Sequence, residues 1–591
     1  MKRILCLSLL LGLLAIPFLA GADQSAADAP RIANFTLKDT AGRAVSLADF
    51  KDKKAVVVVF LGTECPLVNL YTIKLNELHE EFAGQGVQIL AINSNSQDPP
   101  AKVAQHAQQH KLAFPVLKDD GHKVADLFKA ERTPEAFILD RQGVVRYRGR
   151  IDDQFGIGFQ RPKPTRRDVA EALKELLAGK PVSVPKTEVQ GCFIGRETPA
   201  PATGEVTYTK HIARILQKNC QECHRPGQIG PFALLTYKQA RAWSATIHEV
   251  VREGRMPPWH ADPRYGKFAN DRSLSREDRE LLLAWIEQGC PEGDPADLPP
   301  PREFRGADGW AIGKPDVVLH MPVEYQVPAE APDWGIPYQY FTVPTNFDED
   351  KWVQAAEARP GNRAVVHHIL VNVIAPGENL RERHEDLIGH RHLVGTAPGD
   401  MPAIYPPGLA KKIPKGARLL FQMHYTPNGT AQSDRSMVGL IFAKEPPKHI
   451  VRTRTILNRS FAIPPGAANY KVVSTHGEKF ARDAVLLSFM PHMHLRGKSF
   501  EYKAVYPDGT EEILLSVPRY DFGWQSTYRL AEPKRIPAGT RIVCTGHFDN
   551  SAGNPNNPDP TKLVRWGDQT WEEMLIGWVD YYYVEETPDD K

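Results

Sequence analysis

The first third of the chain alternates short apolar runs with stretches of amphipathic spacing. Runs rich in β-branched residues predict buried strands, whereas apolar residues three and four positions apart predict helices. Such alternation is typical of an α/β domain built around one sheet. Two short strands, Phe137–Leu139 and Val144–Tyr147, flank Gln142-Gly143 and predict a hairpin. The other expected elements are Ala55–Phe60, Pro66–Phe82, Val87–Asn93, Pro100–His110 and Arg167–Leu177.

The pattern changes after residue 180. Residues 181–205 are rich in Pro, Thr and Gly and predict a linker. Residues 206–293 have mostly helical spacing, and a proline-rich spacer follows at Pro295–Pro301. From Pro315 onward, short alternating strands separated by Pro, Gly and Asn predict β-sandwiches. The expected helices of the middle region are His211–Lys218, Tyr237–Glu253 and Ser275–Gln288.

Composition narrows the class of protein without identifying it. The 591 residues are too many for one hydrophobic core, so roughly three or four domains are expected. Hydrophobic residues make up 42% and charged residues 24%, which is ordinary for a soluble chain. A net charge of +2 gives no electrostatic reason to expect a nucleic-acid partner. The 50 prolines and 44 glycines favour a loop-rich, β-rich body over helical bundles.

The N-terminus has the three parts of a secretory signal peptide. Lys2 and Arg3 form the positive start, Ile4–Leu19 the apolar run, and Ala20-Gly-Ala22 a small-residue cleavage site. The run is short for a membrane span, which favours cleavage over the alternative of an uncleaved anchor. We therefore expect a signal peptide at 1–22 and an exported protein, periplasmic or extracellular, that keeps no membrane span.

Cys220-Gln-Glu-Cys223-His224 is the most specific motif of the chain. In Cys-x-x-Cys-His, two thiols add to the vinyl groups of a haem, and the adjacent imidazole becomes the proximal iron ligand. A redox dithiol or half of a zinc site is the alternative, but no second ligand pair follows nearby in the sequence. The motif therefore predicts one covalent haem c.

The second axial ligand of the haem is expected later in the same region. Met256 lies in Arg-Met-Pro-Pro-Trp, on a loop stiffened by prolines, and a thioether ligand raises the reduction potential. His260 and His248 are rivals, and a role as core filler is the alternative for Met256. Through QKNCQECHRPGQIGPF and REGRMPPWHADP, this region resembles the cytochrome c domains of bacterial multidomain oxidases. The resemblance implies an all-α cytochrome c domain over 206–293.

Histidines and methionines gather in the β-rich region. His492 and His494 are two apart, so on a strand both side chains face the same side. His367 and His368 are adjacent and need a bulge or turn to bind one metal together. Imidazole suits Cu(II) and a thioether favours Cu(I), so two histidines plus a methionine can hold copper in both redox states. For any single histidine, an ordinary buried polar role is the alternative. The segments VVHHIL, FQMHY, MPHMHLRGK and EEM carry the candidate ligands His367, His368, His424, His492, His494 and Met574.

In this order, the segments resemble the type II copper, ascorbate-dependent monooxygenases, which include peptidylglycine α-hydroxylating monooxygenase and dopamine β-monooxygenase. The resemblance implies two jelly-roll-like domains, at 315–450 and 451–586, and two copper ions separated by a solvent gap. By this resemblance, His367, His368 and His424 hold an electron-transfer copper. His492, His494 and Met574 hold the copper at which O2 reacts.

Two positions depart from that family. Peptide-amidating relatives grip their substrate with an Arg and a Tyr, where this chain has Met490 and Trp578. The departure argues against an anionic peptide terminus as the substrate. His547 is expected to be structural, and His390 and His392 to be structural or to support the metal ligands.

Cys65 is the candidate reactive thiol of the N-terminal region. It lies between an expected strand and an expected helix, and a helix N-terminus lowers the pKa of a thiol. With Pro134 in Arg-Thr-Pro, residues 31–180 resemble the thioredoxin/peroxiredoxin superfamily, which implies a cis-proline there. The family's usual second cysteine is replaced by Val68. Cys65 is expected to pair with Cys192 in a structural or redox-active disulfide, to act alone as a peroxidatic or exchange thiol, or to be idle in a docking module.

Seven cysteines are present, and spacing does not settle how the remaining ones, including Cys290 and Cys544, are used. The whole pattern predicts a multidomain oxidoreductase: an α/β thioredoxin-like domain, an all-α cytochrome c domain and two all-β jelly-roll-like sandwiches, with linkers at 181–205 and 294–314. An external donor would reduce the haem, which would supply electrons for O2-dependent, copper-dependent hydroxylation of an unknown small molecule or peptide. The alternatives are a copper- and haem-binding protein without hydroxylation and a thiol-based redox or maturation factor that works through Cys65.

Overall fold

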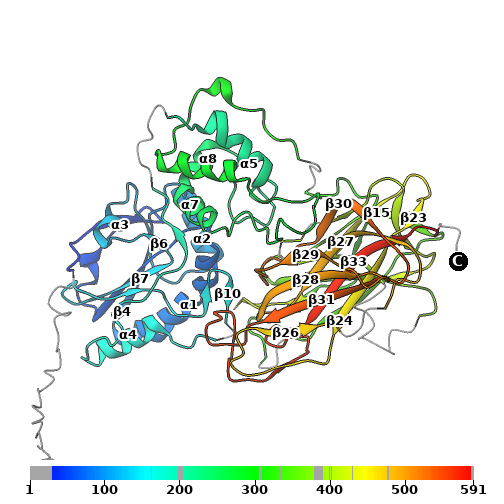
Figure 1. Ribbon diagram of the computed structural model, residues 1–591. Helices are drawn as coiled ribbons and strands as arrows, with labels where there is room; N and C mark the ends of the chain where they lie inside the picture. Colours follow the sequence, from blue (N-terminus) through cyan, green and yellow to red (C-terminus); the bar gives the residue numbers. More distant parts are fainter. Residues whose placement is uncertain are drawn as a thin grey trace, which may run out of the picture.

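The computed structural model describes residues 30–586, except 162, 197–203, 305–308, 333–335, 379–390, 398, 401, 429 and 475–477. The expected signal peptide at 1–22 and His390 lie outside the described residues. Figure 1 shows an α/β domain on one side, a small helical module above it, and a large β-sheet body on the other side. Within the described part of the chain, no helix combines the length and the apolar character that a bilayer crossing needs.

The α/β domain contains a seven-stranded sheet in the order β2-β1-β5-β4-β3-β7-β8. Its central strand β3 (Ala55–Phe60) runs parallel to β4 (Val87–Asn93) and antiparallel to β7 (Glu135–Asp140). Every residue of β3 is buried because both faces of the sheet are covered, which explains its continuous apolar run. The α/β prediction is confirmed. The other elements are β1 (Thr36–Asp39), β2 (Ala44–Ser46), α1 (Pro66–Phe82), α2 (Pro100–Gln109), β5 (Val116–Lys118), α3 (Lys123–Phe128), β6 (Arg132–Thr133), β8 (Val145–Gly149), β9 (Phe155–Gly156), β10 (Phe159–Gln160), α4 (Asp168–Leu177) and β11 (Cys192–Phe193).

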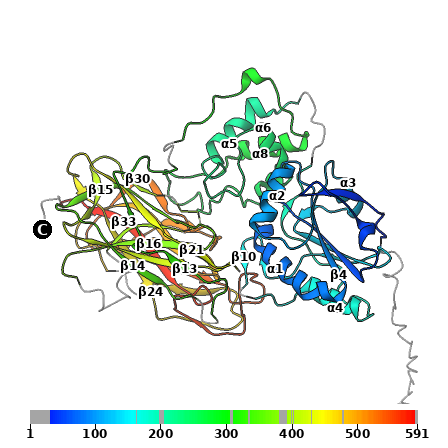
Figure 2. The same cartoon turned by 180° about the vertical axis from the view of Figure 1, so that it is seen from behind.

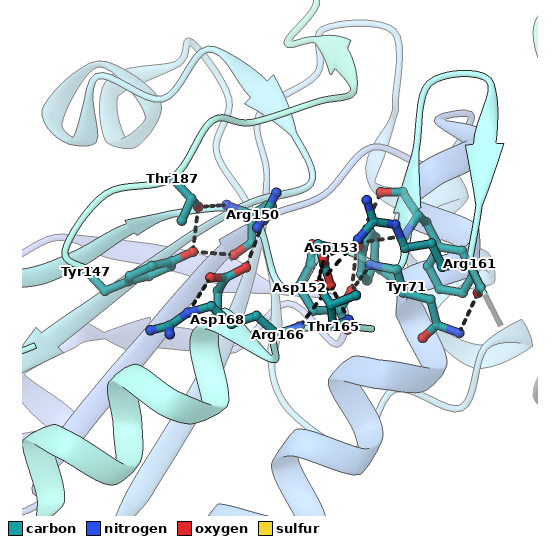
Figure 3. A network of polar contacts seen from close by, with 12 residues as sticks. Tyr71, Tyr147, Arg150, Asp152, Asp153, Arg161, Thr165, Arg166, Asp168 and Thr187 are labelled. Atoms are coloured by element: carbon teal, nitrogen blue, oxygen red, sulfur yellow. Dashed lines mark hydrogen bonds and ion pairs between the residues drawn. The ribbon is translucent and has the colours of Figure 1, made fainter. Parts of the chain in front are cut away.

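A polar network fixes the chain where it leaves this domain (Figure 3). The Asp168 carboxylate accepts hydrogen bonds from Arg150 Nε at 2.8 Å and Arg166 Nε at 3.0 Å. The Tyr147 hydroxyl donates to the Arg150 carbonyl at 2.6 Å and lies 2.7 Å from Thr187 Oγ1. Because Thr187 belongs to the expected linker, the first part of that linker is folded against the sheet.

The helical module is built from α5 (Ala213–Asn219), α6 (Tyr237–Ala242), α7 (Ser244–Arg252) and α8 (Arg276–Glu287). The single helix expected over Tyr237–Glu253 is wrong, because the chain leaves helical geometry at Trp243. The Trp243 ring is 3% exposed and stacks on Phe232 with centroids 3.9 Å apart. Packing of this indole into the module core therefore outweighs continuation of the helix.

The β-rich body consists of two halves, each with paired sheets around a shared core. In the first half, the sheet β14-β20-β16-β17 faces the sheet β12-β22-β15-β19-β23, and Figure 2 shows β14 and β16 from behind. In the second half, β24-β33-β27-β30 faces β26-β31-β28-β29. Two all-β bodies agree with the sequence pattern. The strands of the first half are β12 (Val317–His320), β13 (Tyr325–Val327), β14 (Gln339–Pro344), β15 (Lys351–Arg359), β16 (Val366–Ile374), β17 (His392–Thr396), β18 (Ala403–Ile404), β19 (Leu409–Ile413), β20 (Arg418–Tyr425), β21 (Gln432–Asp434), β22 (Met437–Phe442) and β23 (His449–Ile450).

The second half continues from Arg452 and ends in the strand that passes the candidate metal sites. This strand, β33, pairs with both β24 and β27 at the centre of its sheet. The strands of the second half are β24 (Arg452–Asn458), β25 (Ala462–Ile463), β26 (Tyr470–Val473), β27 (Ala484–His492), β28 (Gly497–Val505), β29 (Glu511–Val517), β30 (Tyr528–Ile536), β31 (Arg541–Phe548), β32 (Val564–Arg565) and β33 (Leu575–Tyr583).

The helical module contacts both neighbours. On one side, Arg132 of the α/β domain forms an ion pair with Glu249 of α7 at 3.0 Å. On the other side, the Trp259 ring lies 4.9 Å from the Tyr528 ring, and Phe268 forms a bridge with Leu530. The module therefore joins the α/β domain to the second β half.

Candidate functional site

The first candidate metal centre lies on two neighbouring strands. His368 of β16 is directly opposite His424 of β20, and the register shifts between Val366 and His368. This bulge turns His367 toward the same side as His368. The ligand atoms of His367, His368 and His424 all lie within 4.8 Å of one another. The expected bulge and the expected clustering of these three residues are both present.

The donor atoms of this cluster fit a metal ion. His367 Nδ1 and His368 Nδ1 are 3.3 Å apart. Two nitrogen ligands that are each about 2.0–2.1 Å from one ion have this separation at a tetrahedral angle. Burial lowers the pKa of His367 to about 4 and places the pKa values of His368 and His424 well below their usual range. The imidazoles are therefore neutral at pH 7, which is the form that binds metals.

The second candidate centre lies at the end of β27. His492 is the last residue of that strand and His494 follows in the loop, so the expectation that both lie on one strand is wrong. Their ring centroids are nevertheless 5.1 Å apart. The buried Glu573 carboxylate accepts the backbone N–H groups of His494 at 2.9 Å and Arg496 at 2.6 Å. This clamp holds the loop against the residue that precedes Met574.

Hydrogen bonds fix which nitrogen of each imidazole is free. Gln525 Nε2 donates to the Phe522 carbonyl at 3.2 Å, which leaves Gln525 Oε1 to accept from His492 Nδ1 at 2.6 Å. His494 Nδ1 lies 3.3 Å from the Glu572 carbonyl. Because both Nδ1 atoms face acceptors, the Nε2 lone pairs of both rings are available to a metal. Burial lowers the pKa of His492 to about 4, so it is neutral as well.

One histidine from each cluster lines a single small cavity. Its volume is about 30 Å³, and its walls include His368, Gln422, Met490, His492, Met574 and Trp578. The Phe522 ring stacks on His367 at 4.9 Å and meets His494 edge-on at 5.9 Å. The cavity has room for one or two water molecules. The solvent gap between two copper ions that the resemblance implies stays a prediction.

The haem-attachment motif lies between α5 and α6. His224 Nδ1 is 3.0 Å from the Phe232 carbonyl, so it carries the proton and Nε2 is free for an iron atom. Gly230 passes so close to the Cys223 carbonyl that a Cβ there would overlap it. The residues of this segment fit a c-type haem, with two thiols and one oriented imidazole on a compact turn.

The three candidates for the second axial ligand occupy different places. Met256 follows α7 on a partly buried loop, with its N–H 3.2 Å from the Val250 carbonyl. His248 pairs with Glu287 at 3.4 Å. Burial lowers the pKa of His260, and the charge of the nearby Arg272 contributes to this shift. The charge of Arg272 also lowers the pKa of Cys223, against the effect of burial. Ligation by Met256 remains a prediction.

Arg272 connects the haem segment to the second metal cluster. Burial raises the pKa of the Cys223 thiol, and the nearby Arg272 guanidinium partly offsets this effect, first through its charge and then through a hydrogen bond. Arg272 Nη2 also donates to the Gly399 carbonyl at 3.1 Å and to Ser526 Oγ at 3.5 Å. Ser526 is the neighbour of Gln525, which binds His492. A short path of bonds and hydrogen bonds therefore runs from the haem motif to a metal-ligand candidate.

The Cys65 thiol lies in the interior of the α/β domain. Cys65 precedes α1, is 1% exposed, and donates from Sγ to the Thr133 carbonyl at 3.1 Å. The Thr133–Pro134 peptide bond is cis, as the superfamily resemblance implies. Cys192, from the expected linker, pairs opposite Thr133 in the small sheet β11-β6. The structure thus places Cys65 and Cys192 beside the same residue, Thr133. Pairing of these two cysteines is one of the alternatives that the sequence leaves open.

Sequence reasoning missed Gln525, Phe522 and Arg272. None of them belongs to a motif, and each is identified only by what the fold places beside it. His547 contacts Ser499 at 3.1 Å, in agreement with a structural role. His392 stacks on Trp578 with centroids 6.4 Å apart, beside the metal cavity.

The fold and these sites define a redox protein with a thioredoxin-like α/β domain and a cytochrome c domain that carries covalent haem c. Residues 29–148 match the AhpC/TSA family, and residues 208–267 match the family described as cytochrome c oxidase, cbb3-type, subunit III. Through its N-terminal domain, the chain belongs to the AhpC/TSA family.

Each of the following relatives matches only part of this chain. Peroxiredoxin Q of Oryza sativa subsp. indica is 35% identical over 121 residues, which are 19% of this chain and 54% of that protein. The thiol-disulfide oxidoreductase ResA of Halalkalibacterium halodurans is 31% identical over 125 residues, 21% of this chain and 69% of that protein. The crystal structure of a hypothetical protein from Sinorhizobium meliloti 1021 is 33% identical, with a TM-score of 0.27, and the match covers 29% of this chain and 95% of that one. The chain spans about half the length of the peroxiredoxins it matches.

Proposed function

We propose that this protein is an exported haem- and copper-containing oxidoreductase that hydroxylates a small molecule or peptide with O2. The observation that carries the proposal is that His368 of the first cluster, His492 of the second cluster and Met574 line one cavity. Export, expected from the N-terminal signal, agrees with the cytochrome c and thioredoxin-like domains, both of kinds that are typically exported.

The chain's own residues supply ligands, orientation and a dry environment. Copper held by these residues would supply one-electron chemistry and reaction with O2, and the haem would supply electrons from an external donor. The buried histidines stay neutral at pH 7, because burial lowers the pKa of His367 and of His492 to about 4. Gln525 fixes the ring of His492, and burial of His368, His424, His492 and His494 limits contact of the ligands with bulk water.

A second cavity supports the presence of a substrate pocket. It has a volume of about 340 Å³ and shares Met490 and Trp578 with the metal cavity. Of its charged residues, Lys411 is paired with Asp580 at 3.5 Å, Arg529 donates to the Pro402 carbonyl, and Asp400 accepts the Thr527 N–H. We place an uncharged, largely apolar small molecule or peptide side chain in this cavity.

Metal analysis combined with O2 uptake tests the proposed function. The haem-loaded chain is expected to bind copper at both clusters, with one ion lost in His424→Ala and the other in His494→Ala. O2 uptake should depend on copper, on reduced haem and on an added substrate. Copper binding without substrate-dependent O2 uptake would instead support the alternative of an electron-transfer protein, and absence of copper binding would contradict both.

A further inference from the structure

The linker strand β11 occupies the groove beside Cys65. It pairs antiparallel with β6, so that Cys192 lies opposite Thr133 and Phe193 opposite Arg132. Addition of an extended strand to a free edge is how many domains bind peptides. Here the added strand belongs to the same chain, and it fills the place that a peptide from another protein would take.

Contacts from two modules hold this strand. Arg132 Nη1 donates to the Gly191 carbonyl at 2.8 Å, and the Arg132 guanidinium lies over the Phe193 ring at 3.9 Å. The Phe193 N–H donates to Thr246 Oγ1 of α7 at 3.2 Å. Gly191 has a φ of +147°, and a Cβ there would overlap the Thr133 carbonyl. The segment therefore approaches Thr133 closely, and it is held by the α/β domain on one side and by α7 on the other.

The two thiols differ in exposure and in charge. Cys65 is 1% exposed, whereas Cys192 is partly exposed. Burial opposes ionisation of Cys65, but hydrogen bonds from the thiol and backbone N–H of Cys192 outweigh it and lower the pKa of Cys65 to about 7. The same thiol hydrogen bond, together with burial, raises the pKa of Cys192 well above its usual range. Cys65 is therefore the thiol of the pair that ionises more readily, and Cys192 is the more exposed residue.

We infer that Cys65 and Cys192 form a reversible disulfide, a second redox site of the chain that exchanges electrons with a small-molecule thiol at Cys192. The groove that would take a protein substrate is filled by β11, which favours a small reactant over a protein dithiol. This inference is independent of the proposed copper chemistry, because no metal ligand takes part in it.

The exchange reaction follows from the positions of the sulfurs. An external thiolate attacks the Cys192 sulfur, the bond between the two cysteines breaks, and Cys65 leaves as a thiolate. A thiolate with a low pKa is the better leaving group. A second external thiol attacks the mixed disulfide, releases Cys192 and leaves as half of an external disulfide. In total, one protein disulfide and two external thiols become two protein thiols and one external disulfide.

Redox titration of the full-length, haem-loaded chain tests the couple. The protein is equilibrated in glutathione buffers of graded ratio, quenched with acid, alkylated and mapped by mass spectrometry. A disulfide between Cys65 and Cys192 is expected in oxidising buffers, with full and repeatable loss in reducing ones. Free thiols at every ratio, or a disulfide that is reduced only after unfolding, would overturn the inference. Reduction by a protein dithiol but not by glutathione would overturn the assignment of a small reactant.

Single-cysteine variants test the two roles. Cys65→Ser is expected to accumulate a mixed disulfide with glutathione at Cys192, whereas Cys192→Ser is expected to leave Cys65 largely unmodified. The opposite pattern would overturn the assignment of Cys192 as the exchanging cysteine. Cys290→Ala, at a buried cysteine of the helical module, is the matched control and should leave the couple unchanged.

Discussion

The side chain of Gln525 determines how His492 presents itself to a metal. Its amide oxygen lies 2.6 Å from His492 Nδ1, and its amide nitrogen is held by the Phe522 carbonyl. Because the amide is anchored at both ends, the imidazole has one tautomer and one orientation before any metal arrives. Gln525 comes from a loop without a recognisable motif, so only the fold shows its role.

Gln525→Leu should weaken copper binding at the second cluster. Loss of an outer partner of a metal-bound histidine typically costs about 10–100-fold in affinity. Competition titration against a chelator, with one cluster removed by His424→Ala, measures the change. Gln422→Leu is the matched control, because Gln422 lines the same cavity but donates to the Tyr340 hydroxyl at 2.9 Å. Equal affinities for the Gln525 variant and its parent would contradict the role of this residue.

Cys192→Ala should raise the pKa of Cys65. Burial opposes ionisation of Cys65, and the hydrogen bond from the Cys192 thiol is one of the contacts that offset burial and lower the pKa to about 7. When that donor is removed, the thiolate is less stable and is populated only at higher pH. The ultraviolet absorbance of the thiolate, followed against pH, measures the shift. An unchanged or lower pKa would show that the backbone donors alone stabilise the thiolate.

At the scale of the elements, β16 shows what a sequence pattern can and cannot predict. Adjacent His367 and His368 alone indicate that a regular strand is impossible if both bind one metal. The strand has a bulge between Val366 and His368, as the adjacent histidines alone predict. By contrast, His492 and His494 looked like a strand pair, but β27 ends at His492 and the loop is held by Glu573 instead. Long-range hydrogen bonds from a backbone N–H to a distant carboxylate have no local sequence signature.

The strand β11 is another element that the sequence does not predict, because a segment rich in Pro, Thr and Gly indicates a linker. Gly191→Ala should release it from β6, because the added Cβ meets the Thr133 carbonyl and the φ of +147° disfavours alanine. Faster proteolysis near residue 192 and faster amide exchange at Phe193 are expected. Gly84→Ala is the control, because Gly84 has no neighbour within 4 Å of a Cβ. Unchanged protection of Phe193 in the Gly191 variant would contradict this role of Gly191.

At the scale of the whole molecule, the order of the domains could be predicted, but their docking could not. Motifs such as Cys-x-x-Cys-His identify each module from local chemistry. Nothing local indicates that residues 259–273 lie on the second β half, where Asp262 N–H donates to the Ser516 carbonyl at 2.8 Å. Contacts between modules depend on surfaces formed only after each has folded. The haem segment is placed beside the second metal cluster by this docking.

Arg272 links the haem segment to the second metal cluster across the contact between the modules. Its guanidinium contacts the Cys223 sulfur and donates to Ser526 Oγ at 3.5 Å, next to the glutamine that binds His492. Arg272→Gln should therefore slow electron transfer from reduced haem to copper several-fold, since a bonded link becomes a gap. Stopped-flow absorbance of the haem, with anaerobic copper-loaded protein, measures the rate. The haem midpoint potential is measured beside it, so that a change of driving force is separated from loss of the path. Arg264→Gln is the matched control, because Arg264 lies on the same loop and pairs only with Asp262 among the described ion pairs. If both variants transfer electrons at the parental rate, the path through Arg272 is not used, and the haem reaches copper by another contact between the modules.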